Sequence, residues 1–284
     1  MILNLFDNRW TQAKKKAQKE TSEIVEHGWE QHVLIDHQNN LVYRYPRNQN
    51  AADKLSDEIE VLRGLHKQDW PVQIPRLLEH NSKYSVYDLI EGEVLTEYRL
   101  SRISNGMAAE IGSDLGIFLA QLHATDKDLV LRKKTKQTIS LYEYYEKRIN
   151  QSMGSRYYNP AKSDLKRISN SLVSQQVVVH GDLHGLNIVV DPRTNKLVGI
   201  IDFSEVETGD PHQDFRKLFM TDERLLKPSV NSYKNAGGKE LSLPLIKYWA
   251  YVNEWANACH FCESPGHPTY QRAVKHLKKW GRLQ

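Results

Sequence analysis

The chain has 284 residues, of which 39 are Lys or Arg and 35 are Asp or Glu, giving a formal net charge of +4 at pH 7. This length suffices for a sizeable core and for two lobes, and the charge is too small to indicate nucleic-acid binding. Two cysteines exclude a disulfide framework, and no apolar run approaches the ~20 residues of a membrane span. We expect a cytoplasmic monomer that binds neither nucleic acid nor a membrane.

The first predicted elements include a β-hairpin. Short, mostly apolar runs at residues 33–35 and 41–43 flank the polar segment 37–40, a pattern typical of two strands joined by a turn. Before them, the three lysines of residues 14–16 are expected to lie on a solvated helix face, because charge runs on helices are usually exposed.

A helix is predicted over residues 51–68, with Asn50 as its N-cap. Its apolar positions recur at helical spacing and form one stripe, namely Leu55, Ile59, Leu62 and Leu65. At the helical period Glu58 falls inside this stripe, and a carboxylate buried there needs a cationic partner. Arg44, at the end of the second strand, is the natural partner, and Arg47 is the alternative. A purely structural ion pair between Arg44 and Glu58 also fits this pattern.

The pattern then changes from strands to helices. Residues 76–80 and 84–89 are predicted to form two more strands. Beyond them, apolar residues at helical spacing predict helices around residues 111–122 and 243–262, while the polar residues 229–238 are expected to form a loop. Strands followed by helices are typical of an α+β fold.

The stretch from residue 177 to 215, VVVHGDLHGLNIVVDPRTNKLVGIIDFSEVETGDPHQDF, gathers most of the recognisable chemistry. Three short β-branched runs, the last two separated by the turn composition DPRTN, predict strand, loop, strand, turn and strand. Asp182 and Asn187 lie on the loop between the first two strands, and Asp202 follows the third. Since the third strand pairs back on the second, these three side chains can converge on one side of the hairpin.

Their chemistry matches what phosphoryl transfer requires. One carboxylate must orient a hydroxyl group, and oxygen ligands must hold the Mg²⁺ that neutralises the phosphates; protein kinases supply these groups in the motifs H-R-D-x-x-x-x-N and D-F-G. HGDLHGLN and IDFS have the corresponding residues at the same spacing. Asp182 is therefore the candidate catalytic residue, and Asn187 and Asp202 are the candidate Mg²⁺ ligands. The competing interpretation is that all three merely cap turns at strand ends.

HGDLHGLN, IDFSEVETGDPHQDF and the upstream YRYPRN resemble the aminoglycoside and macrolide phosphotransferase family, relatives of choline kinase with a protein-kinase-like fold. The resemblance covers residues from about 25 to 220. It implies a two-lobed α+β fold. Residues 1–90 would form a small, mixed-sheet, nucleotide-binding lobe, and residues 91–284 a larger, mainly helical lobe that carries catalysis and substrate binding.

The resemblance also implies a donor site for ATP or GTP. Backbone groups at Asp88 and Ile90 would contact the purine, and Arg44, held by Glu58, would steady the phosphates. Arg44 stands where kinases carry a lysine, and Gly28 is the only glycine where a glycine-rich loop would cover the phosphates.

We therefore expect a small-molecule kinase that transfers a γ-phosphate to a substrate hydroxyl. Seven acidic residues between positions 202 and 223, against Arg216, Lys217 and Arg224, predict a cleft that attracts a cationic acceptor such as an aminoglycoside or a related antibiotic. The competing interpretation is that several of these carboxylates are committed to metal or loop structure. A metabolite kinase acting on choline, an amino sugar or another amino alcohol is the second candidate.

Two other classes stay open, a nucleotide-binding pseudokinase and a protein kinase, although no A-P-E motif follows IDFS. Cys259 and Cys262 form a C-x-x-C without a second pair, so a metal site is not expected there. The aromatic residues of segment 249–255 could form a cage for a quaternary ammonium group, but aromatic residues at helical spacing are more often core.

Overall fold

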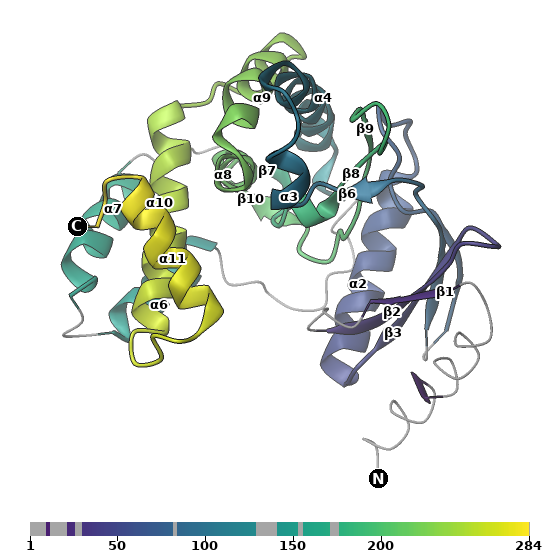
Figure 1. Ribbon diagram of the computed structural model, residues 1–284, viewed down its shortest axis with the longest axis horizontal. Helices are drawn as coiled ribbons and strands as arrows, with labels where there is room; N and C mark the ends of the chain where they lie inside the picture. The colour runs from purple at the N-terminus through teal and green to yellow at the C-terminus, as the bar shows by residue number, and fades with distance from the viewer. Residues whose placement is uncertain are drawn as a thin grey trace.

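The computed structural model describes most of the chain (Figure 1). The described residues are 10–11, 22–25, 30–81, 84–128, 141–152, 156–170 and 176–283. The expected solvated helix at residues 14–16 and the single glycine Gly28 lie outside them. None of the helices within these ranges is long and apolar enough to span a membrane.

The first part of the chain forms a sheet in the order β1-β2-β3-β5-β4, and every described strand pair in it is antiparallel. It is not the expected mixed sheet, because short turns between successive strands reverse the chain direction. Its strands are β1 (Ser22–Val25), β2 (Gln31–Asp36), β3 (Leu41–Pro46), β4 (Leu77–His80) and β5 (Ser85–Asp88). The predicted hairpin is confirmed: β2 pairs with β3, and Asn40 in the turn adopts a φ of 54°. The carboxylate of Asp36 accepts the N–H groups of Gln38 and Asn39, which fixes the turn.

Helix α2 (Gln49–Leu65) lies beside this sheet (Figure 1). Its N-cap is Asn48 and not the expected Asn50, because the backbone is extended at Asn48, whose side chain accepts the N–H of Ala51 at 3.0 Å. Asn50 is already inside the helix. The predicted apolar stripe is buried, and Glu58 within it is fully buried as well.

The motif-rich stretch folds as predicted into strand, loop, strand, turn and strand. The elements are β7 (Val177–Val179), the short 3-10 helix η1 (Gly185–Asn187), β8 (Ile188–Val190) and β9 (Leu197–Ile200). Two further strands flank them, β6 (Glu93–Val94) beside β8 and β10 (Glu207–Gly209) beside β7. Gln73, in the segment between α2 and β4, binds this hairpin: its backbone oxygen accepts the N–H of Ile200 and its N–H donates to the Val198 oxygen, each at 2.9 Å.

The rest of the described chain is helical. The helices are α3 (Glu97–Leu100), α4 (Asn105–Ala124), α6 (Leu141–Asn150), α7 (Tyr158–Ser169), α8 (His212–Thr221), α9 (Glu223–Asn235), α10 (Leu243–His260) and α11 (Pro268–Lys279). The expected loop over residues 229–238 is wrong, since α9 continues to Asn235. The reason is burial: Ser229 and Tyr233 on this helix are both fully buried.

Two hydrophobic cores hold these helices. The larger one runs from α2 and the sheet through α4, the β7–β9 strands, α8 and α9. The smaller one joins α6, α7, α10 and α11 and contains Trp249 and Trp255, both fully buried, so these aromatic residues are core and do not line an open cage. Cys259 lies buried in the same core and Cys262 packs against it, and both are free.

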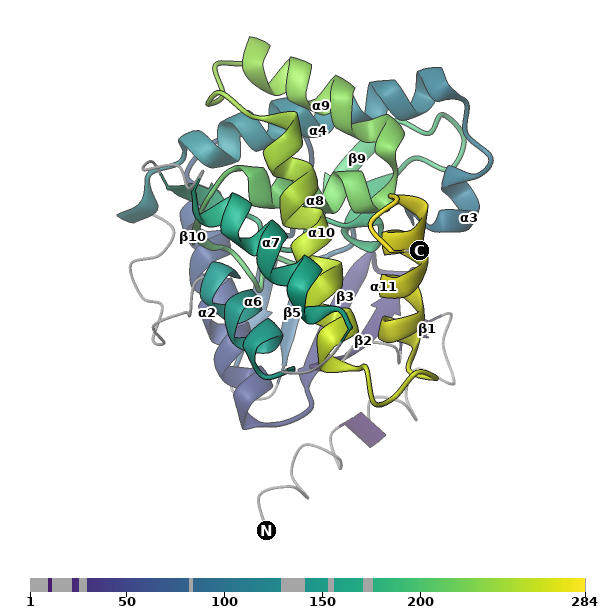
Figure 2. The ribbon, with the colours of Figure 1, turned by 90° about the vertical axis from the view of Figure 1, so that its left-hand side faces the viewer.

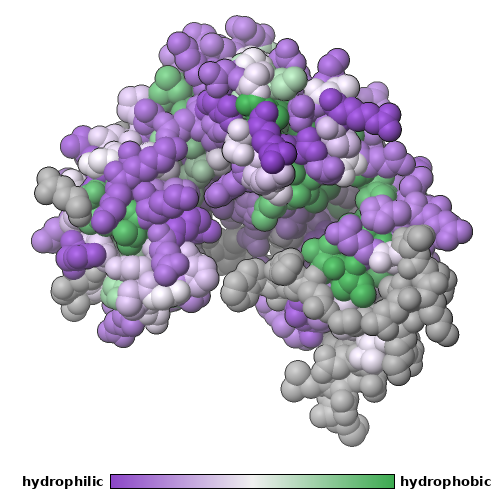
Figure 3. Space-filling model, in the orientation of Figure 1, coloured by the Kyte–Doolittle hydropathy of each residue, from purple (hydrophilic) through white to green (hydrophobic). Residues whose placement is uncertain are grey.

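The molecule is arranged as an arch in Figure 1. The sheet and α2 form one side, α4, α8 and α9 form the top, and α6, α7, α10 and α11 form the other side, where Figure 2 shows them clustered. Figure 3 shows the surface hollowed between the part formed by the C-terminal helices and the part formed by the sheet.

Candidate active site

The loop after β7 is held in place by Asp214 of α8. The Asp214 carboxylate accepts the backbone N–H groups of His180 and Gly181, each at 2.9 Å, and lies 3.1 Å from Nε2 of His123. Burial alone would raise the pKa of Asp214, but the His123 contact and these backbone bonds hold it below its ordinary value. Gly181 has a φ of 82°, a conformation that favours glycine. The loop that carries Asp182 is therefore fixed by a buried, ionised group.

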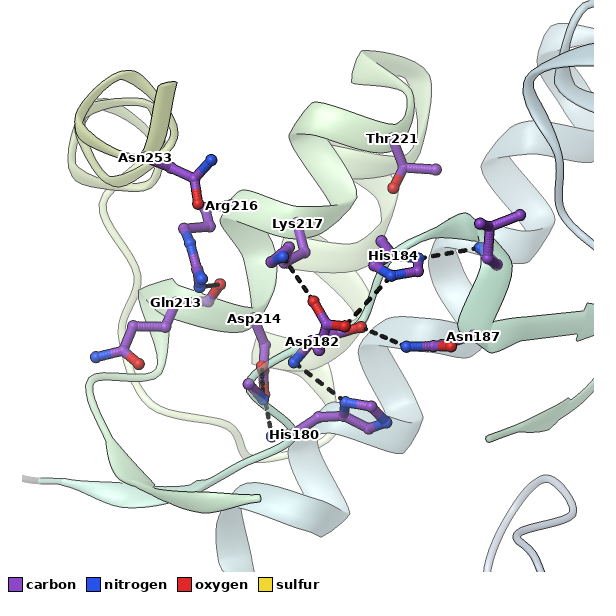
Figure 4. A network of polar contacts seen from close by, with 12 residues as sticks. His180, Asp182, His184, Asn187, Gln213, Asp214, Arg216, Lys217, Thr221 and Asn253 are labelled. Carbon is purple, nitrogen blue, oxygen red and sulfur yellow. Dashed lines mark hydrogen bonds and ion pairs between the residues drawn. The ribbon is translucent and has the colours of Figure 1, made fainter. Parts of the chain in front are cut away.

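Asp182 has a partner on each carboxylate oxygen (Figure 4). Lys217 Nζ donates to Oδ1 at 2.6 Å, and His184 Nε2 lies 3.3 Å from Oδ2. The Nδ1 atom of His184 accepts the Leu186 N–H, so in the neutral ring the proton is on Nε2, facing Asp182. Burial alone would raise the pKa of Asp182, but His184 and Lys217 together bring it well below its usual range. The group is a carboxylate at neutral pH, suited to orienting a hydroxyl.

Asn187 is fixed on the same loop. Its Nδ2 donates to the backbone oxygen of Asp182 at 2.9 Å, and Figure 4 shows the amide oxygen pointing away from Asp182. The backbone N–H of Ile201 donates to the Asn187 backbone oxygen at 3.0 Å, which brings the end of β9, and therefore Asp202, beside this loop.

Asp202 is in an unusual position for a carboxylate. Its φ is 63°, in the left-handed region that residues other than glycine rarely adopt. Its Oδ1 is buried and accepts no hydrogen bond from the described residues; the nearest cation is Arg44 Nη2, at 3.6 Å. A buried carboxylate oxygen with free lone pairs is costly unless a cation or donor completes it, so this atom fits a metal ligand.

Arg44 and Glu58 meet as expected. Arg44 Nη1 donates to Glu58 Oε1 at 2.6 Å, and its Nε donates to Gln31 at 2.5 Å. The Glu58 oxygen also accepts the backbone N–H of Phe203 at 3.2 Å. Burial lowers the pKa of Arg44, but the charges of Glu58 and Asp202 outweigh it, so the pKa is raised and the guanidinium stays charged. The alternative partner, Arg47, follows the end of β3, and its backbone N–H donates to the Glu30 oxygen at 2.9 Å.

Asp88 and Ile90 lie at some distance from this cluster. On the paired strands β3 and β5, Arg44 lies opposite Ser85, and Leu41 lies opposite Asp88. Arg44 and Asp88 are therefore separated by about 10 Å along the strands. The side chain of Asp88 pairs with Arg76, and its N–H donates to the Arg76 oxygen at 3.1 Å. The side chain of Ile90 is buried.

A sequence model of the phosphotransferase enzyme family matches residues 21–252 of the chain. The chain belongs to this family. Its membership confirms the resemblance and the expected enzyme class, a phosphotransferase that acts on hydroxyl groups.

Solved structures of other phosphotransferases confirm the two-lobed, kinase-like fold. The GDP and kanamycin complex of APH(2")-IIia has 16% identity and a TM-score of 0.75, with 91% of this chain and 92% of that chain covered. The streptomycin-ATP-APH(2")-IIa ternary complex has 15% identity and a TM-score of 0.73, with 96% of each chain covered. Macrolide 2'-phosphotransferase type I has 20% identity and a TM-score of 0.71, with 90% of each covered.

The acidic residues of this phosphotransferase between positions 202 and 223 are largely committed to structure. Five of the seven have partners within the fold, namely Lys54 for Glu205, His212 for Asp210, the His180–Gly181 backbone for Asp214, Arg224 for Asp222 and Lys279 for Glu223. Asp202 is the candidate metal ligand. This favours the competing interpretation of the acidic run. The run therefore gives no electrostatic support to a cationic acceptor.

Lys217 is the residue at this site that sequence reasoning missed. It was counted only as a charge in the acidic run, yet its ammonium lies against Asp182. The signal was its spacing: Lys217 follows Asp214 by three residues, one helical turn, and Asp214 holds the backbone just before Asp182. A helix docked through Asp214 therefore places the next turn at the candidate catalytic residue.

Proposed function

We propose that this phosphotransferase is a small-molecule kinase that uses ATP or GTP. An acceptor oxygen forms a bond to the γ-phosphorus, the bond from that phosphorus to the oxygen shared with the β-phosphate breaks, and the nucleoside diphosphate leaves. The hydroxyl proton passes by way of Asp182 to solvent. The observation that carries this proposal is that Glu58 accepts hydrogen bonds from both Arg44 and the residue after Asp202, which joins three predicted site residues in one cluster.

Asp182 would act mainly by orientation. Its pKa is far below neutral, which makes it a weak base but a permanent acceptor for a hydroxyl proton. Its loop is fixed by Asp214 and Asn187, so the accepting oxygens are held in place before the acceptor arrives.

Asn187 and Asp202 would hold Mg²⁺. They offer an amide oxygen and a buried carboxylate oxygen to which none of the described residues donates, and hard oxygen ligands are what this ion prefers. When bound, the ion would supply the positive charge that neutralises the phosphates. Arg44 would add a fixed guanidinium on the same side, since it is held by Glu58 and lies near Asp202.

The purine would lie toward Asp88 and Ile90. Because the N–H of Asp88 is already bound to Arg76, a purine contact there would use the Asp88 carbonyl. The separation of about 10 Å between these residues and Arg44 suits an extended nucleotide with its base at one end of the strands and its phosphates at the other.

Two acceptor classes follow. The first is an aminoglycoside or a related antibiotic, supported by the resemblance and by the kanamycin and streptomycin named for the similar structures. The second is a metabolite such as choline, an amino sugar or another amino alcohol, which carries a single positive charge. The commitment of the acidic residues to ion pairs favours this second class, because it removes the attraction expected for a polycation.

The proposal is tested by nucleoside diphosphate release with Mg²⁺, using ATP and GTP separately. The acceptors are pooled aminoglycosides, macrolides, choline, amino sugars and hydroxy acids. We expect one pool to stimulate release, and Asp182→Asn to lose the stimulation. Glu110→Gln removes one charge from an exposed site on α4 and is the matched control. Nucleotide binding without stimulated release by any pool would instead support the pseudokinase interpretation.

A further inference from the structure

Lys217 approaches Asp182 from a different side than Asn187 does (Figure 4). The amide of Asn187 and the buried oxygen of Asp202 define the side for metal and phosphates. Lys217 reaches in from α8, and Arg216 precedes it on the same helix. Its side chain is 19% exposed, so Lys217 is largely withdrawn from water. This places a cation on the side of Asp182 that is left for the acceptor.

The surroundings of Lys217 are rich in positive charge. Arg216 is only 2% exposed, donates to the Gln213 backbone oxygen at 2.5 Å and lies over the ring of Tyr145. Burial, above all, lowers the pKa of Lys217; Asp182 opposes this, while Arg216 and Arg272 of α11 lower it further. Within the described part of the chain, Asp182 is the only carboxylate that forms an ion pair with Lys217.

Other nearby carboxylates do not balance these cations at the site. Glu254 is fully buried and is already paired with His276 at 2.8 Å and with Arg272 at 3.6 Å. Asp214 is taken by the backbone of the Asp182 loop. An acceptor hydroxyl that donates to Asp182 must either displace Lys217 from a carboxylate oxygen or share that oxygen with it. Either change weakens the ion pair of Lys217, and its ammonium, which is largely withdrawn from water, then needs another anion nearby.

We propose that Lys217 is a specificity-determining residue that binds an anionic group, a carboxylate or a phosphate, carried by the acceptor close to the hydroxyl that is phosphorylated. This inference rests on the proposed function, because it assumes that Asp182 orients that hydroxyl. An ammonium at the same place on the acceptor would meet the charges of Lys217 and Arg216 and bind poorly.

Matched acceptors of similar size test the inference. One series is gluconate, glucose and glucosamine, and the other is glycerate, glycerol phosphate, glycerol and serinol; comparison of glycerate with glycerol phosphate separates a carboxylate from a phosphate. With the wild type, we expect the best anionic member to have a KM about tenfold lower than its neutral analogue, the value of one charge-assisted hydrogen bond. Preference for the neutral or cationic members would overturn the inference while leaving phosphotransfer intact.

Variants of Lys217 give the second readout. Lys217→Met removes a partner of Asp182 and should slow the reaction with every acceptor, but it should raise the KM for the anionic acceptor about tenfold more than the KM for the neutral analogue. Lys217→Arg should restore part of the preference for the anionic acceptor. Lys227→Met, on the exposed side of α9, is the control for loss of one charge. A fall in kcat shared by all acceptors, with the KM preference for the anionic member unchanged, would contradict the inference, since it would place Lys217 on the transferred phosphate or on Asp182 alone.

Binding measured by calorimetry without nucleotide separates this inference from the proposed function. Anionic members should bind the wild type more tightly than their neutral analogues, and Lys217→Met should abolish that difference, even if no acceptor is phosphorylated. Equal binding of anionic and neutral members would overturn the role of Lys217. Absence of phosphate transfer with an intact binding preference would overturn only the proposed reaction.

Discussion

The carboxylate of Glu58, on helix α2, accepts the backbone N–H of Phe203, the residue that follows Asp202, at 3.2 Å. The two residues are far apart in the chain, so this bond joins the sheet part of the molecule to the loop after β9. Phe203 is fully buried and its ring lies 4.8 Å from the ring of His180, just before Asp182. The Arg44–Glu58 pair and both aspartates therefore belong to one continuous packed unit.

Loss of the Glu58 charge should destabilise the protein. Glu58→Gln removes the counter-charge of a largely buried guanidinium, and breaking a buried ion pair from one side costs about 3 kcal/mol. Chemical denaturation measures the free energy of unfolding. Glu60→Gln is the matched control, because Glu60 pairs with Arg63 on the outer side of the same helix and such pairs contribute less than about 1 kcal/mol. Equal effects of the two variants would contradict the account.

Arg44→Lys should weaken nucleotide binding although lysine is the residue that kinases carry in this role. Arg44 contacts Gln31 and Glu58 through different nitrogens and approaches Asp202 with a third, and a single ammonium cannot replace that fork. We expect the KM for the nucleotide to rise about tenfold, with a smaller change in kcat. Arg63→Lys, half-exposed on α2, serves as the control. A KM equal to that of the wild type would show that the fork is dispensable.

Asp214 should make stability depend on pH. Its pKa is lowered in the folded protein, so its stabilisation is present above the pKa of the unfolded chain, at about 4, and is lost as the pH falls toward the lower folded value. The stability difference between wild type and Asp214→Asn should narrow as the pH falls below about 4. Urea unfolding at acid pH measures the free energy of unfolding of both proteins. A difference between them that increases as the pH falls below about 4 would contradict the predicted direction.

Close packing of α4 on α9 should make Gly116 intolerant of a side chain. A Cβ at Gly116 would lie 2.2 Å from the Ser229 backbone oxygen, whereas one at Gly106, at the start of the same helix, would have its nearest neighbour at 3.7 Å. Gly116→Ala should cost about 1 to 3 kcal/mol, and Gly106→Ala should be neutral or stabilising by up to about 1 kcal/mol. Thermal and urea unfolding of both variants compare them directly. Similar stabilities would mean that the two helices can separate without cost.

Sequence reasoning worked where the deciding signal is local. The β7–β9 stretch follows from short apolar runs and one turn composition, and the Arg44–Glu58 contact follows from a carboxylate on an apolar stripe. It failed where two local choices compete or where docking decides. Asn48 and Asn50 are both plausible caps, and only the backbone at Asn48 selects between them. Likewise, the polar face of α9 looks like a loop until Ser229 and Tyr233 are packed against α4.

The site shows the same division. The types and spacing of Asp182, Asn187 and Asp202 are enough by themselves to indicate phosphoryl-transfer chemistry. The contact of Lys217 with Asp182 depends instead on how α8 docks through Asp214, and the partners of the acidic run lie on α2, α11 and the Asp182 loop. The acidic cleft was predicted from the number of charged residues in this segment. That number does not include the cations from other parts of the chain that pair with them.

The most direct test of the central claim is mass-spectrometric detection of a phosphorylated acceptor after incubation with Mg²⁺ and either ATP or GTP. The wild type and the Glu110→Gln control should convert the same acceptor, and Asp182→Asn and Asp202→Asn should yield at most about one hundredth as much product. Equal product from Asp182→Asn, or nucleotide binding by the wild type with no phosphorylated acceptor in any pool, would contradict the account.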